Sequence, residues 1–205
     1  MTERSWRFPR PRLPVLGDAA RSRLVDVAWA SLRGRVDAAR LSESGLPELD
    51  APGAVFVTLW LDGDLRGCIG SAIPSRPLVQ AVAEQARAAA TLDPRFGAVG
   101  PGEIERLEVE ISVLGPLLRL EAEPDERVAS VRVGEDGVYV VGGDRSALLL
   151  PQVATRFGLS ATMFLEEVCT KAGLRSSAWR DRRVDVHTFR TLGIPAPRTP
   201  AERAL

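Results

Sequence analysis

Apolar residues recur at helical spacing in three long stretches of the chain. The first follows Asp18, a residue type that favours the N-cap, and its apolar stripe is Leu24, Val27, Ala28, Leu32 and Val36. The second starts near Ser75 and Pro77 and carries Val79, Val82, Ala83, Ala86 and Ala90. The third, between Ser160 and Gly173, carries Phe164, Leu165, Val168 and Ala172. A shorter helix is expected from Pro151 to about Gly158.

Other stretches alternate with the period of a strand. Residues 106–114 place Leu107, Val109, Ile111 and Val113 on one face and polar side chains on the other. Residues 55–61 and 65–70 flank Asp62-Gly63-Asp64, which predicts a hairpin, and residues 131–133 and 138–141 flank Gly134–Gly137, which predicts a second. The stretch from Ser42 to Gly53 has no period and is expected to be a loop.

Helices and strands are intermixed, and no βαβ unit repeats along the chain. The hairpins require antiparallel pairing. The pattern therefore predicts an α+β fold, with an antiparallel or mixed sheet and flanking helices.

Composition and charge narrow the class of protein. Of 205 residues, 45% are hydrophobic and 26% are charged, which is typical of a packed, water-soluble domain. Lys and Arg number 27, as do Asp and Glu, so the net charge does not support nucleic-acid binding. No apolar run approaches the roughly 20 residues that a membrane span needs, and the Pro/Arg-rich start lacks a secretory signal. We expect a cytoplasmic protein.

The two cysteines, Cys68 and Cys169, lie far apart and match no zinc-ligand spacing. They predict neither a disulfide scaffold nor a metal site. Cofactors are not indicated by any motif, because the chain lacks the HExxH, GxSxG, Walker and dinucleotide-binding patterns.

The segment from Leu65 to Gly70, LRGCIG, is the strongest candidate for chemistry. Side chains alternate along a strand, so Arg66 and Cys68 are expected on one face. A neighbouring guanidinium stabilises thiolate over thiol, and the thiolate is the nucleophile. Gly67 and Gly70 mark a close approach to the backbone, either by a ligand or by a packed helix, and the helix is the more common reason.

Three further residues are weaker candidates. His187 is the sole histidine and thus the sole imidazole that a cysteine nucleophile has available, although a surface or edge-strand position explains it better. Glu110 shares the polar face of its strand with Glu108, as an acid, a base or simply a solvated side chain. Arg95 follows Asp93 in a predicted turn and is a candidate cleft residue.

Five blocks together resemble the AmmeMemoRadiSam system protein A family, which carries the AMME chromosomal-region candidate protein domain. They are LRGCIG from Leu65, DPRF from Asp93, EISVL from Glu110, LLLPQVA from Leu148, and FLEEVCTKAGL from Phe164 followed by Trp179. Their order and spacing match as well. The resemblance spans residues 17–192, and leaves a leader at 1–16 and a tail at 193–205.

The resemblance implies a single domain of this type with a larger and a smaller subdomain and a cleft between them near LRGCIG. Gly67, Gly70, Arg95, Glu110 and Gln152 are then expected to line that ligand cleft. The implied partners are a Memo-like protein and a radical-SAM enzyme of a shared modification pathway. A small molecule is a further candidate ligand.

The sequence departs from the family's usual pattern in three places. Ser146-Ala147 stands where Arg-Gly is frequent, Phe157 where Trp is frequent, and His187 where an aromatic such as Tyr is typical. The third departure makes Arg66, rather than His187, the expected activator of Cys68.

Three hypotheses follow for the function. The favoured one is a binding or accessory component, because a cysteine without a convincing base is an incomplete catalytic set. The second is a cysteine-dependent enzyme in which Arg66 activates Cys68. The third is purely structural, with Arg66 paired to a carboxylate and Cys68 in the core.

Overall fold

The computed structural model describes residues 9–41 and 44–197. These form two compact units. The larger unit comprises residues 15–41, 44–114 and 192–197, and the smaller unit comprises residues 9–14 and 115–191. Two units agree with the expected subdomains, whereas the cleft between them stays a prediction. Parts of the expected leader (1–8), loop (42–43) and tail (198–205) lie outside the described residues.

The larger unit contains a four-stranded sheet in the order β2-β1-β3-β8. Its strands are β1 (Ala54–Leu61), β2 (Asp64–Ser71), β3 (Leu107–Leu114) and β8 (Thr191–Ala196). The predicted hairpin is confirmed, since β1 and β2 pair antiparallel around a two-residue turn. Asp62 (φ 53°) and Gly63 (φ 88°) both have positive φ, as the favoured type I′ hairpin turn requires.

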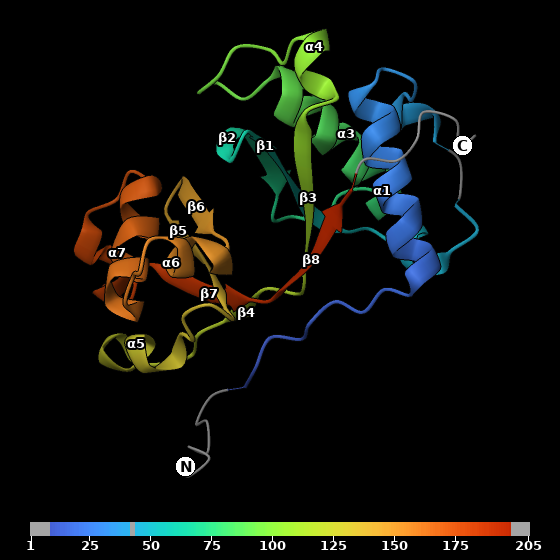
Figure 1. The fold of residues 1–205 in the computed structure, drawn as a ribbon. Helices are drawn as coiled ribbons and strands as arrows, with labels where there is room; N and C mark the ends of the chain where they lie inside the picture. Colours follow the sequence, from blue (N-terminus) through green and yellow to red (C-terminus); the bar gives the residue numbers. More distant parts are fainter. Residues whose placement is uncertain (1–8, 42–43, 198–205) are drawn as a thin grey trace, which may run out of the picture. The chain divides into compact units, whose positions relative to one another are not determined.

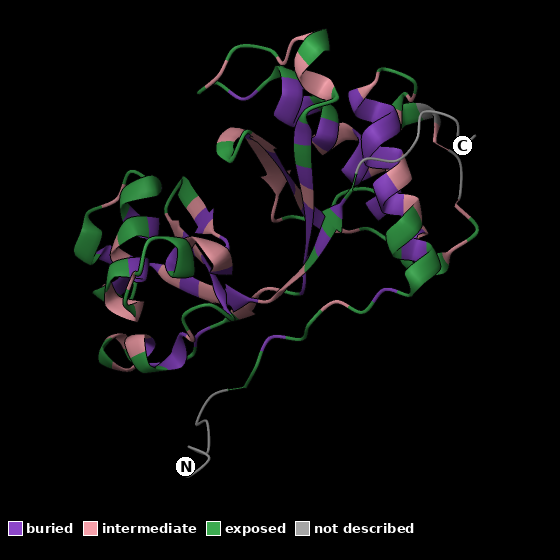
Figure 2. Ribbon diagram, viewed as in Figure 1, coloured by how far each residue is buried: buried purple, intermediate pink, exposed green. Residues whose placement is uncertain are grey.

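Two long helices, α1 (Asp18–Leu32) and α3 (Leu78–Thr91), cover one face of this sheet (Figure 1). The shorter elements of the unit are η1 (Ala38–Arg40), α2 (Pro47–Asp50) and α4 (Pro101–Ile104). The apolar positions of the sheet face the helices and form one core, as the alternation in β3 predicts; they include Val55, Val57, Leu59, Leu107, Val109, Ile111 and Val113. Buried residues accordingly gather between helices and sheet in Figure 2. The opposite face of the sheet carries the polar side chains.

The smaller unit contains a second four-stranded sheet, in the order β4-β7-β5-β6. Its strands are β4 (Leu118–Arg119), β5 (Gly137–Gly142), β6 (Arg145–Leu149) and β7 (Asp185–Phe189). Its helices are η2 (Pro124–Glu126), α5 (Arg127–Ser130), α6 (Pro151–Arg156), α7 (Ala161–Lys171) and η3 (Ser176–Arg180). Val138, Val140 and Val186 from the sheet form a core with residues of α7 that include Phe164, Leu165 and Val168. Both sheets are antiparallel, which confirms the predicted α+β class.

The predicted caps of α7 are confirmed. The Ser160 side chain accepts a hydrogen bond from the Met163 N–H, at 3.3 Å. At the other end Gly173 has φ 71°, and the Leu174 N–H reaches back to the Cys169 carbonyl. A glycine is favoured there because a residue with a Cβ rarely adopts this conformation.

Three local predictions were wrong. Gly17, rather than Asp18, is the N-cap of α1, and Asp18 is instead the acidic residue of the first turn. The expected loop from Ser42 to Gly53 contains the one-turn helix α2, started by Pro47.

The second hairpin is also displaced, because β5 pairs with β6 rather than with residues 131–133. Its turn lies at Gly143 (φ 66°). The Asp136 carboxylate instead accepts the Arg132 N–H, and this closes residues 132–136 into a local turn.

Among the described residues, no helix has the length and apolar character needed to cross a membrane.

Gly67 allows α3 to lie directly against β2. A Cβ at this position would stand 2.1 Å from the Ala89 carbonyl oxygen of α3, which is closer than any real contact. The helix backbone therefore occupies the space that a side chain would need. Of the two explanations left open by the sequence, the packed helix is the one that the structure supports at Gly67.

We predict that Gly67→Ala destabilises the protein by about 1–3 kcal/mol, because α3 and β2 must separate to admit the methyl group. Thermal or urea unfolding measures the effect. Gly102→Ala is the matched control, since a Cβ at Gly102 in α4 meets nothing within 4 Å. Equal stability of the two variants would contradict the close packing.

Candidate functional site

Cys68 lies in β2, an edge strand, and its side chain is partly exposed. It is directly opposite Thr58 of β1. The Thr58 hydroxyl donates a hydrogen bond to the Cys68 sulfur at 3.4 Å. This thiol is therefore not in the core, unlike Cys169 of α7, whose burial raises the pKa of its thiol.

The backbone of Cys68 points away from β1 and is bound by the loop that follows α3. The Asp93 carboxylate accepts the Cys68 N–H at 2.8 Å, and the Arg95 Nη2 donates to the Cys68 carbonyl at 3.4 Å. The acid and the guanidinium thus occupy the place that another strand would take at this edge. We call Asp93 and Arg95 the edge clamp.

The edge clamp is a tightly bonded ion pair. Arg95 Nε and Nη2 donate to the two Asp93 carboxylate oxygens at 2.9 and 2.7 Å, and the Arg95 backbone N–H donates to the same carboxylate. The Asp93 side chain is 1% exposed, whereas that of Arg95 is 53% exposed. A planar guanidinium bound at two points by a buried acid has a fixed orientation.

The charges of the edge clamp stabilise each other. The hydrogen bonds from the Arg95 side chain hold the pKa of Asp93 well below its usual range, and the Cys68 N–H adds to this effect. The pKa of Arg95 is raised chiefly by its hydrogen bonds to Asp93 and, less strongly, by charge attraction and a hydrogen bond to Cys68. Arg95 is therefore a cation held beside the backbone of Cys68.

Arg66, the expected activator of Cys68, is engaged elsewhere. Its Nε and Nη2 donate to the two Glu103 carboxylate oxygens at 3.0 Å each. It also donates to the carbonyls of Gly97 and Ala98. The hydrogen bonds with Arg66 lower the pKa of Glu103 to about 2. Arg66 thus holds the loop before α4, and the pairing with a carboxylate matches the structural hypothesis for this residue.

At Gly70 too, neighbouring residues pack directly against the backbone. A Cβ at Gly70 would lie 2.3 Å from the ring of Phe56 and 2.4 Å from the Val55 carbonyl oxygen. As at Gly67, atoms of the protein fill the space beside the backbone. That Gly67 and Gly70 also line a ligand cleft stays a prediction.

Glu110 belongs to the same sheet face as Cys68. Thr58 of β1 pairs with Cys68 on one side and with Glu110 of β3 on the other. Ser112, two residues along β3, donates its hydroxyl to the Glu110 carboxylate at 3.4 Å. The register therefore aligns a thiol, a hydroxyl and a carboxylate across three strands.

Two predicted candidates belong to the smaller unit. Gln152 lies in the first turn of α6 and is partly buried. His187 lies in β7, an inner strand between β4 and β5, so the edge-strand explanation was wrong. Burial lowers the pKa of His187, and its ring stands against that of Tyr139 at 5.8 Å between centroids. That Gln152 or His187 belongs to the same site as Cys68 stays a prediction.

The sequence does not reveal the roles of Asp93 and Thr58 at Cys68. The Asp93 carboxylate accepts the Arg95 N–H, which agrees with the turn predicted for these residues. Its longer-range bond to Cys68 depends on where α3 ends relative to β2. The one sequence signal for this contact is that DPRF and LRGCIG are both among the five blocks that resemble the family.

We predict that the free energy of unfolding falls less between pH 7 and pH 2 in Asp93→Asn than in the wild-type chain. A carboxylate with a depressed pKa in the folded state stabilises the fold above its unfolded-state pKa of about 4, and this stability is lost as the pH falls through the folded-state value. At pH 7 the variant should be less stable by about 2 kcal/mol, because charged hydrogen bonds are lost. Urea unfolding between pH 7 and pH 2 measures both effects. Asp64→Asn, at an exposed position of β2, is the control, and parallel curves for all three proteins would contradict the role of Asp93.

Comparison with known proteins identifies the family. The AMMECR1 family profile matches residues 25–193 of this chain. A protein of Methanocella arvoryzae is 42% identical over 151 residues, which cover 72% of this chain and 76% of that protein. A protein of Aeropyrum pernix is 42% identical over 180 residues, which cover 85% and 78% respectively. The names of these relatives state no activity.

The fold recurs in a solved structure. The crystal structure of an uncharacterized protein from Pyrococcus horikoshii superposes with a TM-score of 0.80 at 37% identity. The match covers 87% of this chain and 92% of the other. Sequence and fold agree over nearly the same span, and the chain therefore belongs to the AMMECR1 family.

Proposed function

We propose that this chain is a binding or accessory component of a modification pathway, acting in the cytoplasm with Memo-like and radical-SAM partners. Membership of the AMMECR1 family and the five sequence blocks support the proposal. The structural support is the way in which Cys68 is held. The partners rest on the resemblance to the AmmeMemoRadiSam system.

The observation that carries the proposal is a positioned thiol in a unit that has no imidazole. Thr58 and the edge clamp fix Cys68 on both sides. The sole histidine of the chain, His187, is in the smaller unit. Cysteine nucleophiles are usually activated by a base that a third group orients. Within the larger unit the thiol is therefore held without such a base, and this arrangement suits recognition.

Arg95 indicates what the site recognises. Its Nε donates to Asp93, and its Nη2 donates to Asp93 and to the Cys68 carbonyl. About half of its side chain is exposed. The buried Asp93 fixes the guanidinium before any ligand arrives, which reduces the entropy lost on binding. The ligand that fits this arrangement carries an anionic group for Arg95 and, beside it, an atom that contacts or reacts with the Cys68 thiol.

A cysteine-dependent enzyme is the second candidate, and one observation favours it. The Arg95 guanidinium donates to the Cys68 carbonyl, so a cation lies beside the residue that carries the thiol. In this version Arg95 replaces Arg66 as the activator, because Arg66 is bonded to Glu103. The two candidates differ in whether the thiol itself is required.

We predict that Cys68, compared with a free thiol in solution, favours an anionic methanethiosulfonate reagent over its cationic counterpart. The Arg95 charge attracts the first and repels the second. The rates are measured by mass spectrometry of the intact chain, in which Cys169 is buried. Arg95→Gln should shift the ratio of the two rates by about tenfold toward the cationic reagent, which corresponds to about 1.4 kcal/mol.

The matched control is Arg76→Gln, on an exposed arginine paired with Glu84. It should leave the ratio unchanged. An identical ratio for the wild-type chain and Arg95→Gln would show that Arg95 does not act on reagents at Cys68. A Cys68 that resists both reagents in the folded protein would remove the site altogether.

We predict that Cys68→Ser retains activity in the cell if the role is accessory. The test complements a strain that lacks the gene, with circular dichroism to show that the variant folds. Isothermal titration of the purified chain with the Memo-like protein of the same genome measures the partnership directly. A folded Cys68→Ser variant that fails to complement favours the enzyme, and the absence of any complex contradicts the proposed partner.

A further inference from the structure

One face of the smaller sheet packs on α7, and the other carries the unit's aromatic and charged strand residues. The core valines of β5 and β7 point toward α7. Side chains alternate along a strand, so Tyr139 and Val141 of β5, and Asp185 and His187 of β7, point the other way. All four side chains are partly exposed. We call the surface that these four residues form the aromatic face.

A pair of rings lies at the centre of the aromatic face. Tyr139 is directly opposite His187, on the two inner strands of the sheet. Their ring centroids are 5.8 Å apart, with 46° between the ring planes. Leu148 of β6 is directly opposite Tyr139 on its other side and continues the row as an apolar side chain. Aromatic side chains on a four-stranded sheet are a recurring surface on which proteins stack nucleobases.

The charges beside the two rings balance. Arg119 of β4 is directly opposite His187, and its Nε and Nη2 donate to the Asp185 Oδ1 at 3.1 and 2.6 Å. Glu121 lies 3.6 Å from the Arg119 guanidinium, and the buried Arg127 donates to the carbonyls of residues 179 and 181. Burial lowers the pKa of His187, so its ring is uncharged at neutral pH. Such a surface favours an uncharged planar ligand over an anion or a cation.

Two polar atoms of the aromatic face are available to a ligand. The Tyr139 hydroxyl and the second carboxylate oxygen of Asp185, Oδ2, form no hydrogen bond with the residues that the structure describes. A hydroxyl donates and accepts, whereas a carboxylate only accepts. A ligand that satisfies Asp185 must therefore donate from the edge of its ring. Guanine carries two adjacent N–H donors, on its ring N1 and its 2-amino group, whereas the N1 of adenine is an acceptor.

We propose that the aromatic face binds the guanine base of a free nucleoside. The base stacks on Tyr139 and His187 and donates an N–H to the Asp185 Oδ2. A nucleic-acid strand fits less well, because Arg119 and Arg127 are already bonded within the unit and are not set out along a phosphate backbone. The inference concerns the smaller unit and goes beyond the function proposed for Cys68.

The sole histidine and the sole tyrosine of the chain make a direct test possible, because each gives one set of ring signals in an NMR spectrum. The full chain, with its histidine and tyrosine rings isotopically labelled, is titrated with guanosine. We expect the ring signals of His187 and Tyr139 to shift upfield to saturation, because a stacked base shields them. D-ribose should leave both sets unchanged, and adenosine should bind several-fold more weakly than guanosine.

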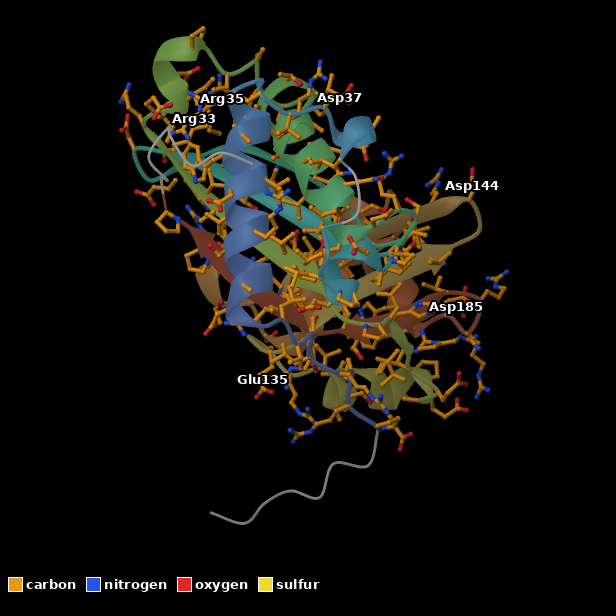
Figure 3. All side chains as sticks on the ribbon, turned by 90° about the vertical axis from the view of Figure 1, so that its right-hand side faces the viewer. Arg33, Arg35, Asp37, Glu135, Asp144 and Asp185 are labelled. Carbon is orange, nitrogen blue, oxygen red and sulfur yellow. The ribbon has the colours of Figure 1, made fainter. Side chains whose placement is uncertain are left out.

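Variants separate the stacking from the hydrogen bond. Tyr139→Leu should weaken guanosine binding by about tenfold, because stacking on one aromatic ring is lost, whereas Tyr139→Phe keeps the ring and should retain most of the affinity. Asp185→Asn should remove the preference for guanosine over adenosine. Asp144→Asn is the matched control, on an exposed acid of the smaller unit that Figure 3 labels together with Asp185. Circular dichroism shows whether each variant folds.

Ring signals of the wild-type chain that do not respond to guanosine, or that respond equally to D-ribose, would overturn the proposal. So would a folded Tyr139→Leu variant that binds guanosine as tightly as the wild-type chain. Equal affinities of the wild-type chain for guanosine and adenosine would contradict the role of Asp185. Cys68→Ser should respond to guanosine as the wild-type chain does, so the outcome is independent of the proposed function at Cys68.

Discussion

The carboxylate of Asp93 is the group on which the Cys68 site depends. It is buried, and it binds the backbone N–H of Cys68 and the Arg95 guanidinium at once. A buried carboxylate is tolerated only when such partners satisfy it, so these bonds hold the loop after α3 against β2. That position closes the edge of the sheet beside Cys68 and sets the direction of Arg95.

Packing elsewhere in the larger unit makes this bond feasible. Gly67 lets α3 lie against β2, and the helix ends at Thr91, two residues before Asp93. Arg66 then fixes the continuation of the loop through Glu103. The two arginines thus have different tasks, since Arg66 of β2 holds the loop and Arg95, within that loop, lies beside Cys68.

Much of the fold follows from the sequence because its signals are local. The alternation of β3 and the Asp62-Gly63 turn each specify a structure within a few residues. The second hairpin differs from the prediction: residues 132–136 form a local turn closed by the bond from the Arg132 N–H to Asp136, and β5 pairs with β6. A side chain that closes its own turn is hard to recognise without knowing which groups are buried.

The candidate site was predictable as a segment but not as a set of contacts. Alternation correctly placed Cys68 on an accessible strand face, and it also suggested Arg66 as its neighbour. Alternation describes only a single strand, however. Apart from Thr58, the partners of Arg66 and Cys68 named above come from residues 93–103, about 25 to 37 positions away, and their contacts depend on the length and packing of α3.

Hydrogen exchange at the Cys68 amide tests the central claim most directly. An N–H that points outward from an edge strand exchanges rapidly unless another group binds it. The Asp93 bond predicts a protected Cys68 amide in the wild-type chain and a fast-exchanging one in Asp93→Asn, with the amides of β1 and β3 protected in both. A Cys68 amide that exchanges rapidly in the wild-type protein would contradict the account.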